Sequence, residues 1–196
     1  GFVRCQTIGG SDPALARGQR VTIQGRVGPV QGVIGQLAIH LQEADDRKKV
    51  PDWHQMFIDI GATSRKEAEE IVRVGDPVTY SCGVLELRNH RIAARACDNR
   101  IGTFAAAEGL RLAAENRRKL QACVVAVSTI QEENGLYGAA MAGYSEHPDV
   151  ALVVDVTHAT DIPFCTKSKH GDVRLGGGPV LSIGSANHPV VNERLT

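Results

Sequence analysis

The sequence has no excess of charge of either sign and no long apolar run. Its 196 residues include 22 basic and 22 acidic side chains, so the formal net charge is zero. A balanced charge gives no basic surface for nucleic acid or for an anionic membrane, and neither is expected as a partner. No stretch of 18 apolar residues occurs, which excludes a helix that spans a membrane.

The sequence also lacks paired cysteine spacing. The five cysteines are odd in number and scattered, and no two of them form a Cys-x-x-Cys motif. This usage favours a reduced, cytoplasmic setting over an oxidising one.

What the sequence does contain is a set of four carboxylates that follow short apolar runs. They are Asp98, the adjacent pair Glu132 and Glu133, and Asp155. An acid at the end of a buried strand is costly unless a positive group meets it there. Several such strand ends at one edge of a sheet face the same crevice. Taken singly, each acid could be a helix cap or a turn residue, but together they predict a metal site.

The spacing between these acids favours a strand–helix–strand unit. Residues 122–129 are continuously apolar and rich in β-branched side chains, as in a strand that is covered on both faces. Residues 136–147 are rich in Ala and Gly and suffice for about three helical turns. Residues 150–156 form a second apolar run. A right-handed crossover would leave the acids that follow the two strands at the same sheet edge.

The pattern of predicted secondary structure changes near residue 92. Before it, short β-prone segments alternate with glycines and predict a small β-rich domain over residues 1–90. The expected strands are 20–26, 30–35, 38–42, 56–60 and 77–84. Ser64 followed by Glu67 forms a capping box that predicts a helix to about residue 72.

From residue 91 to 196 the order of elements is that of part of an α/β domain. A helix is expected over residues 101–117, followed by the strand–helix–strand unit. The boundary between the two domains is expected at residues 86–92.

Three motifs carry a resemblance to a known family. They are Asp98-Asn99-Arg100-Ile101-Gly102, Gln131-Glu132-Glu133-Asn134-Gly135-Leu136, and Val154-Asp155-Val156-Thr157-His158-Ala159. In this order and spacing they resemble the glutamyl and deblocking aminopeptidases, two-metal peptidases that include the tetrahedral aminopeptidases and some proteins labelled endoglucanases.

The resemblance implies a fold, an activity and a role for each acid. The fold is α/β, with a parallel-sheet, zinc-peptidase-like catalytic domain and a small β-rich, barrel-like inserted domain. Asp98 would bridge two divalent ions, zinc or cobalt, while Glu133 and Asp155 would each bind one of them. Glu132 would be the general base. The substrates would be peptides, and the protein would be a homo-oligomer built from dimers, up to a tetrahedral dodecamer.

The resemblance also implies features near the acids that can be checked. A cis peptide bond is expected between Asp98 and Asn99. Two histidine ligands of the family pattern have no counterpart here, so the chain is expected to be an internal portion of a longer protein and to bind metal poorly and lack activity alone. Asn134 and Tyr137 stand where many relatives have Val and Arg, so the resemblance does not define the substrate preference.

Some assignments stay open from the sequence alone. His158 lies three residues after Asp155, and packing is favoured over metal binding for it. A glycoside hydrolase also uses two acids, but the adjacent Glu132 and Glu133 do not suit opposite faces of a sugar bond. A non-catalytic or incomplete relative of the family would carry the same acids, and so would a deacetylase or carboxypeptidase of similar architecture.

Overall fold

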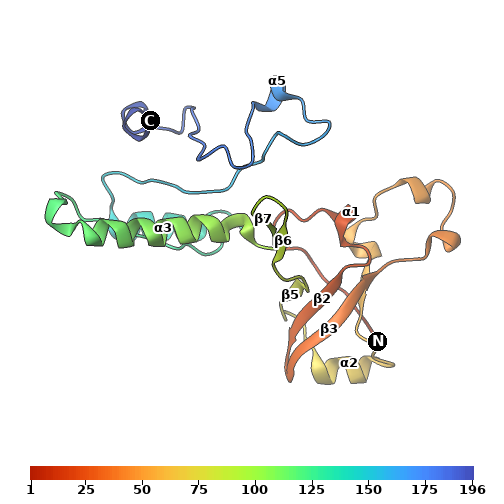
Figure 1. Cartoon of the computed structure of the whole chain (residues 1–196). Helices are drawn as coiled ribbons and strands as arrows, with labels where there is room; N and C mark the ends of the chain where they lie inside the picture. The colour runs from red at the N-terminus through yellow and green to blue at the C-terminus, as the bar shows by residue number, and fades with distance from the viewer.

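The structure is a computed structural model that describes residues 1–196. Its first part is built on a five-stranded antiparallel sheet with the strand order β1-β4-β3-β2-β5 (Figure 1). The strands are β1 (Phe2–Val3), β2 (Arg20–Gly25), β3 (Gly28–Gly35), β4 (Phe57–Asp59) and β5 (Val78–Tyr80).

The β2–β3 hairpin sets the register of this sheet. The two strands pair from Arg20 opposite Val33 to Gly25 opposite Gly28, and Gly28 has a positive φ of 124° at the turn. Because side chains alternate along a strand, Val21 and Ile23 share one face, and each is only 1% exposed. A slip by one residue would move this apolar set to the solvent face, which is why the register is well defined.

The hydrophobic core lies under one face of this sheet. Its buried members come from the three central strands and from the segments around them: Ala16, Val21, Ile23, Ile34, Met56, Ile58 and Val72. Two helices flank it, α1 (Pro13–Ala16) and α2 (Arg65–Ile71). All of the 12 buried residues except Gly102 and Thr160 precede residue 73. Burial therefore concentrates in the β-rich part of the chain.

Helix α2 begins with the predicted cap, but the Glu67 side chain bonds to Thr63 instead of to Ser64. Ser64 Oγ accepts a hydrogen bond from the backbone N–H of Glu67 at 3.2 Å. The Glu67 carboxylate reaches past Ser64 and accepts instead from the N–H and the hydroxyl of Thr63, at 2.8 and 2.7 Å. These donors, the backbone N–H first, hold the pKa of Glu67 below its ordinary value.

Replacing this cap should destabilise the β-rich part measurably. We expect Ser64→Ala to lower the free energy of unfolding by about 1 kcal/mol, because an N–H in the first turn of α2 loses its acceptor. Urea unfolding followed by circular dichroism measures the loss. Lys66→Ala is the matched control, since Lys66 is exposed on the same turn and its side chain makes no hydrogen bond. An equal loss in both variants would contradict the capping role.

Most of the predicted strands are confirmed within a few residues, but the one at 38–42 is wrong. These residues form a 3₁₀ turn, Ile39–Leu41, one of three in this connection with Asp46–Lys48 and Trp53–Gln55. The N–H of Leu41 donates to Ala38 O at 2.9 Å, and the Gln42 side chain donates to Leu37 O at 2.6 Å. Local partners thus satisfy groups that a strand would pair with a neighbour.

A two-stranded hairpin lies where the domain boundary is predicted. It consists of β6 (Leu85–Leu87) and β7 (Arg91–Ala93), and its turn contains Asn89 and His90 with φ of 61° and 55°. Figure 1 shows this hairpin between the five-stranded sheet and the long helix that follows. We retain the division into residues 1–90 and 91–196 as a proposal.

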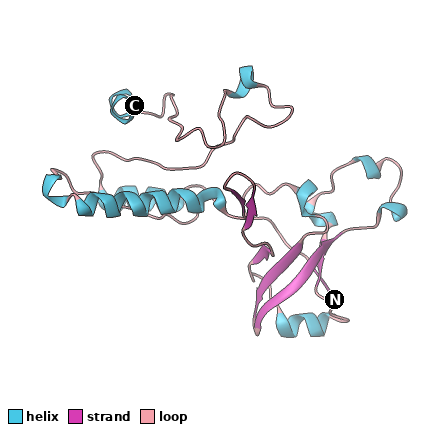
Figure 2. Cartoon of the chain, viewed as in Figure 1, coloured by secondary structure: helices cyan, strands magenta, loops and turns pink.

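After the hairpin the chain is helical and irregular (Figure 2). Its helices are α3 (Cys97–Glu115), α4 (Tyr137–Glu146), α5 (Lys167–His170) and α6 (Pro189–Leu195), with a 3₁₀ turn at Arg117–Lys119. Helices α3 and α4 confirm the two that the sequence predicts. None of the helices is both long enough and apolar enough to cross a membrane.

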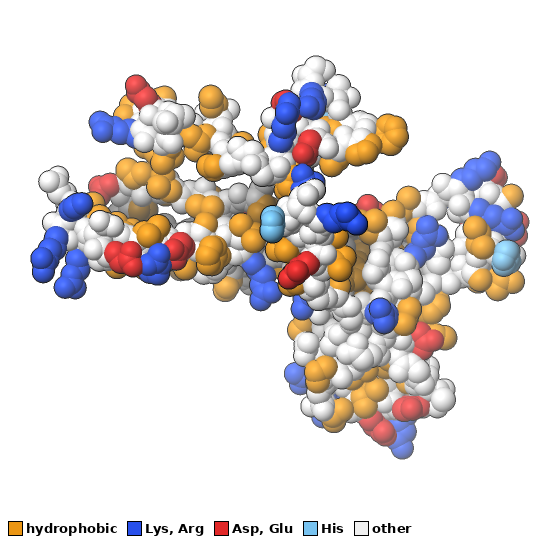
Figure 3. Space-filling view, in the orientation of Figure 1, with side chains coloured by type: hydrophobic (Ala, Val, Ile, Leu, Met, Phe, Trp, Pro, Cys, Tyr) orange, Lys and Arg blue, Asp and Glu red, His pale blue; other side chains and the backbone are white.

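The predicted parallel pair at residues 122–129 and 150–156 is not formed in the structure. Neither run contains a hydrogen-bonded strand, and Val125 and Val153 are 54% and 91% exposed. Apolar side chains predict that a segment can be buried, but a strand also needs a neighbour for its N–H and C=O groups. Figure 3 shows hydrophobic side chains at the surface around α3 and in the segments above it.

Candidate functional site

Asp98 lies at an irregular turn that opens α3. Asp98 (φ −82°, ψ 112°) and Asn99 (φ −119°, ψ 56°) are not helical, and the preceding Ala96 is left-handed with φ 59°. The peptide bond between Asp98 and Asn99 is cis, which confirms the expectation. The regular part of the helix follows this turn, so Asp98 is placed at its beginning.

The side chain of Asn99 joins this turn to the segment that carries Asp155. Its Oδ1 accepts from the backbone N–H of Gly102 at 2.7 Å, and its Nδ2 donates to Val154 O at 2.8 Å. Gly102 is buried here, and a Cβ on it would lie 2.6 Å from Val154 O. The start of α3 and the chain at Val154 are therefore in direct contact, and each contact lies next to a predicted metal ligand.

Glu132 and Glu133 belong to a tight turn that leads into α4. Glu132 O accepts from the N–H groups of Gly135 and Leu136 at 3.1 and 3.0 Å. The carboxylate of Glu133 packs against Gly9, whose φ is +69°. A Cβ on Gly9 would collide with Glu133 Oε2 and lie 3.1 Å from the Glu133 Cβ. The predicted ligand Glu133 thus contacts the segment between β1 and α1, which precedes the β2–β3 hairpin.

All four predicted site acids are exposed and available as ligands. None of their carboxylates forms an ion pair, and only the Asp155 carboxylate accepts a hydrogen bond, from the N–H of Val156 at 2.8 Å. Carboxylate oxygens suit divalent cations, so the donor types fit the predicted metal. The structure contains no group of three or more His, Cys, Asp or Glu side chains arranged to hold an ion. It brings the segments of Asp98 and Asp155 together but does not assemble the full set.

A second polar cluster lies downstream and was missed from the sequence. The hydroxyl of Thr160, which is only 4% exposed, accepts from Val173 N at 2.8 Å and lies 2.9 Å from Gly171 O. Asp172 pairs with Arg174 at 2.8 Å and Lys167 at 2.7 Å, and these partners hold the pKa of Asp172 far below its ordinary value. No motif or spacing in the sequence marks Thr160 as buried. His158, two residues earlier, is exposed and makes no side-chain hydrogen bond, so the packing expected for it is not formed.

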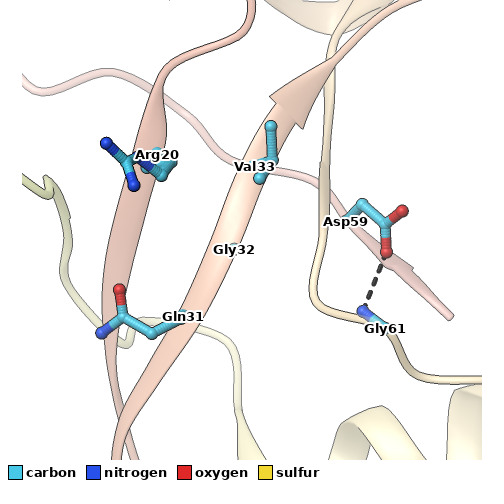
Figure 4. Close-up of a pocket in the computed structure, with 6 residues that line it drawn as sticks. All are labelled: Arg20, Gln31, Gly32, Val33, Asp59 and Gly61. Carbon is cyan, nitrogen blue, oxygen red and sulfur yellow. Dashed lines mark hydrogen bonds between the residues drawn. The ribbon is translucent and has the colours of Figure 1, made fainter.

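Two surface hollows have linings that include none of the four acids. One lies on the outer face of the five-stranded sheet (Figure 4) and is lined by Arg20, Gln31, Gly32, Val33, Asp59 and Gly61. Asp59 is turned toward Gly61 and accepts from its N–H at 2.8 Å. A second hollow lies beside Thr160. The acids themselves stand at an open surface.

Comparison with known proteins places the chain among peptidases. A family model described as M42 glutamyl aminopeptidase matches residues 1–196. The lysyl aminopeptidase of Pyrococcus furiosus is 34% identical over 199 residues, which cover 100% of this chain and 54% of that protein. The chain therefore spans about half the length of this curated relative.

Solved structures give the same result. The aminopeptidase APDkam598 from the archaeon Desulfurococcus kamchatkensis is 37% identical with a TM-score of 0.83, over 100% of this chain and 54% of that one. The TET1 peptidase of Pyrococcus horikoshii, which can assemble into a tetrahedron or a large octahedral shell, is 28% identical with a TM-score of 0.67, over 83% and 50%. The fold is the α/β fold of these peptidases, and the chain belongs to the M42 glutamyl aminopeptidase family.

Proposed function

We propose that the protein is a metal-dependent aminopeptidase that removes the N-terminal residue of peptides. The observation that carries this proposal is the family match over the whole chain, which includes all four predicted acids. The contact of Asn99 with Val154 supports it, because it places the segments of two proposed ligands side by side.

Asp98, Glu133 and Asp155 would hold two divalent ions, zinc or cobalt, and Asp98 would be the ligand shared by both. Such ions, when bound, lower the pKa of a shared water and polarise a carbonyl group. Glu132 would take a proton from the attacking water on a carboxylate oxygen and return it to the leaving amine.

The surroundings of the two adjacent glutamates favour this division of roles. The backbone of Glu132 is fixed through its carbonyl, which accepts two N–H groups, while its carboxylate has no hydrogen-bond partner. A general base needs this combination of a fixed position and a free oxygen. Glu133 is instead packed against Gly9, which limits where its oxygens can lie and suits a ligand.

The assembly and the setting of the protein are part of the same proposal. A similar peptidase forms tetrahedral or octahedral shells, and we propose a homo-oligomer built from dimers, up to a tetrahedral dodecamer. A cytoplasmic location remains a prediction from the cysteine usage.

A glycoside hydrolase is not favoured. Its two acids flank the scissile bond with carboxyl groups about 5 to 10 Å apart. Glu132 and Glu133 are neighbours in one turn, and the lysyl aminopeptidase and APDkam598 are both named as peptidases. A non-catalytic relative of the family would differ from the proposed enzyme by showing no turnover of peptides with any metal.

A panel of aminoacyl-nitroanilides tests the proposal on the whole protein. We expect turnover of substrates with a free α-amine, loss of turnover when metal is removed, and its return when zinc, cobalt or manganese is added back. Acetylated and C-terminal substrates are the controls that a deacetylase or carboxypeptidase would prefer. Hydrolysis of cellulose alone, or no activity with any metal, would contradict the proposal.

A further inference from the structure

We infer that Asn99 is a positioning residue that sets the place of Asp155 relative to Asp98. The inference rests on the proposed function, since it concerns the two acids as metal ligands. It goes further by assigning their relative placement to a neutral side chain that binds no ion itself. The geometry around the Asn99 amide carries it.

The segment of Asp155 depends on Asn99 for its attachment. Residues 150–156 form no strand and make no backbone hydrogen bond to another part of the chain. The bond from Asn99 Nδ2 to Val154 O, at 2.8 Å, is the one long-range hydrogen bond that this segment makes. Because Val154 precedes Asp155 directly, the Asn99 amide controls where the Asp155 backbone lies.

The amide is held in one orientation by a second bond. The N–H of Gly102 donates to Asn99 Oδ1 at 2.7 Å, and only the oxygen end of an amide can accept it. The NH₂ end must then face Val154 O. Asn99 itself is partly buried, and its bond with the Gly102 N–H is the more buried of the two.

The bond from Asn99 to Val154 also requires that α3 lie close to the Val154 backbone. Gly102 is buried between Asn99 and Val154, and a Cβ there would lie 2.6 Å from both Asn99 Nδ2 and Val154 O. Glycine is thus the residue that leaves room for the bond. The link between the opening turn of α3 and the Asp155 segment is therefore built from three residues that contribute no metal ligand.

Loss of this link should appear first in metal binding. Residues that orient a ligand without touching the ion typically change metal affinity by about 10- to 100-fold when they are replaced. We expect Asn99→Ala to weaken one of the two ions by that factor, because Asp155 is no longer held opposite Asp98. The Gly102 N–H also loses its acceptor.

The test measures zinc and cobalt affinity of the whole protein by calorimetry, together with the visible spectrum of the cobalt form. Asn99→Ala should weaken metal binding and change the absorption spectrum of the cobalt form. If Asn99 had only a structural role, the spectrum would stay unchanged once the ions were bound. Asn99→Leu keeps the branched shape of the side chain without its hydrogen bonds, and should show the same loss. Circular dichroism confirms that each variant is folded.

Asn192→Ala is the matched control. The Asn192 amide also donates to a backbone carbonyl, Ser182 O at 2.8 Å, but it belongs to α6 and adjoins no predicted ligand. The affinity of the Asn192→Ala variant for both ions should equal that of the wild type. Wild-type affinity and spectrum in a folded Asn99→Leu variant would overturn the inference, whereas a wild-type protein that binds no ion would overturn the proposed function instead.

Discussion

Replacing Glu132 with Gln should reduce turnover by about two orders of magnitude or more while the metal content stays near that of the wild type. The amide keeps the size of the side chain but cannot accept the proton of the attacking water. The Glu132 backbone should be unaffected, because it is fixed through its carbonyl group rather than its carboxylate. Steady-state kinetics and elemental analysis of the same preparation measure both quantities.

Glu133→Gln is the control that separates a base from a ligand. Since Glu133 is proposed to hold an ion, its variant should lose metal as well as activity. If Glu132→Gln lost metal while Glu133→Gln kept it, the two roles would be reversed. If neither variant changed turnover, the acids of this turn would not belong to the catalytic site.

Ile58→Ala should strongly destabilise the β-rich part. Ile58 is fully buried in β4, between Val3 on β1 and Ile34 on β3. A Cβ on Gly32 would lie 2.6 Å from the Ile58 Cγ2 atom, so the side chain is packed tightly against its neighbours. Removing it leaves a cavity that the sheet cannot close, and we expect a loss of about 2–5 kcal/mol.

Two further variants make this result specific. Ile58→Val removes one methylene group and should cost about 0.5–1.5 kcal/mol. Ile92→Ala, at a position that is 55% exposed on β7, should change stability little. Urea unfolding gives all three values, and a loss below about 1 kcal/mol for Ile58→Ala would show that the sheet is not packed as described.

The parts of the fold that the sequence predicts well are those encoded by neighbouring residues. Strands β2 and β3 follow from short β-prone segments separated by glycines, and helix α2 from Ser64 and Glu67 three residues apart. The turn into α4 is local as well. In each case the groups that satisfy the backbone lie within a few residues of one another, so spacing alone identifies them.

The parts that were missed depend on partners far away in the sequence. The expected strand at 38–42 finds local acceptors instead, and the runs at 122–129 and 150–156 have no paired neighbour. Asn99 was noted only as part of a motif, because its partner Val154 is 55 residues away. The sequence thus suffices to propose which acids form the site, whereas the contacts around them could not be predicted from it.

The contact of Glu133 with Gly9 has a mechanical consequence. Gly9 lies on the chain between β1 and α1, while Glu133 lies on the turn before α4. Gly9 has no side chain of its own, so a displacement of the segment between β1 and α1 would bear on the Glu133 side chain. If a molecule bound to the five-stranded sheet displaced that segment, metal affinity would change with it, and linkage would require metal to change the affinity for that molecule by the same factor.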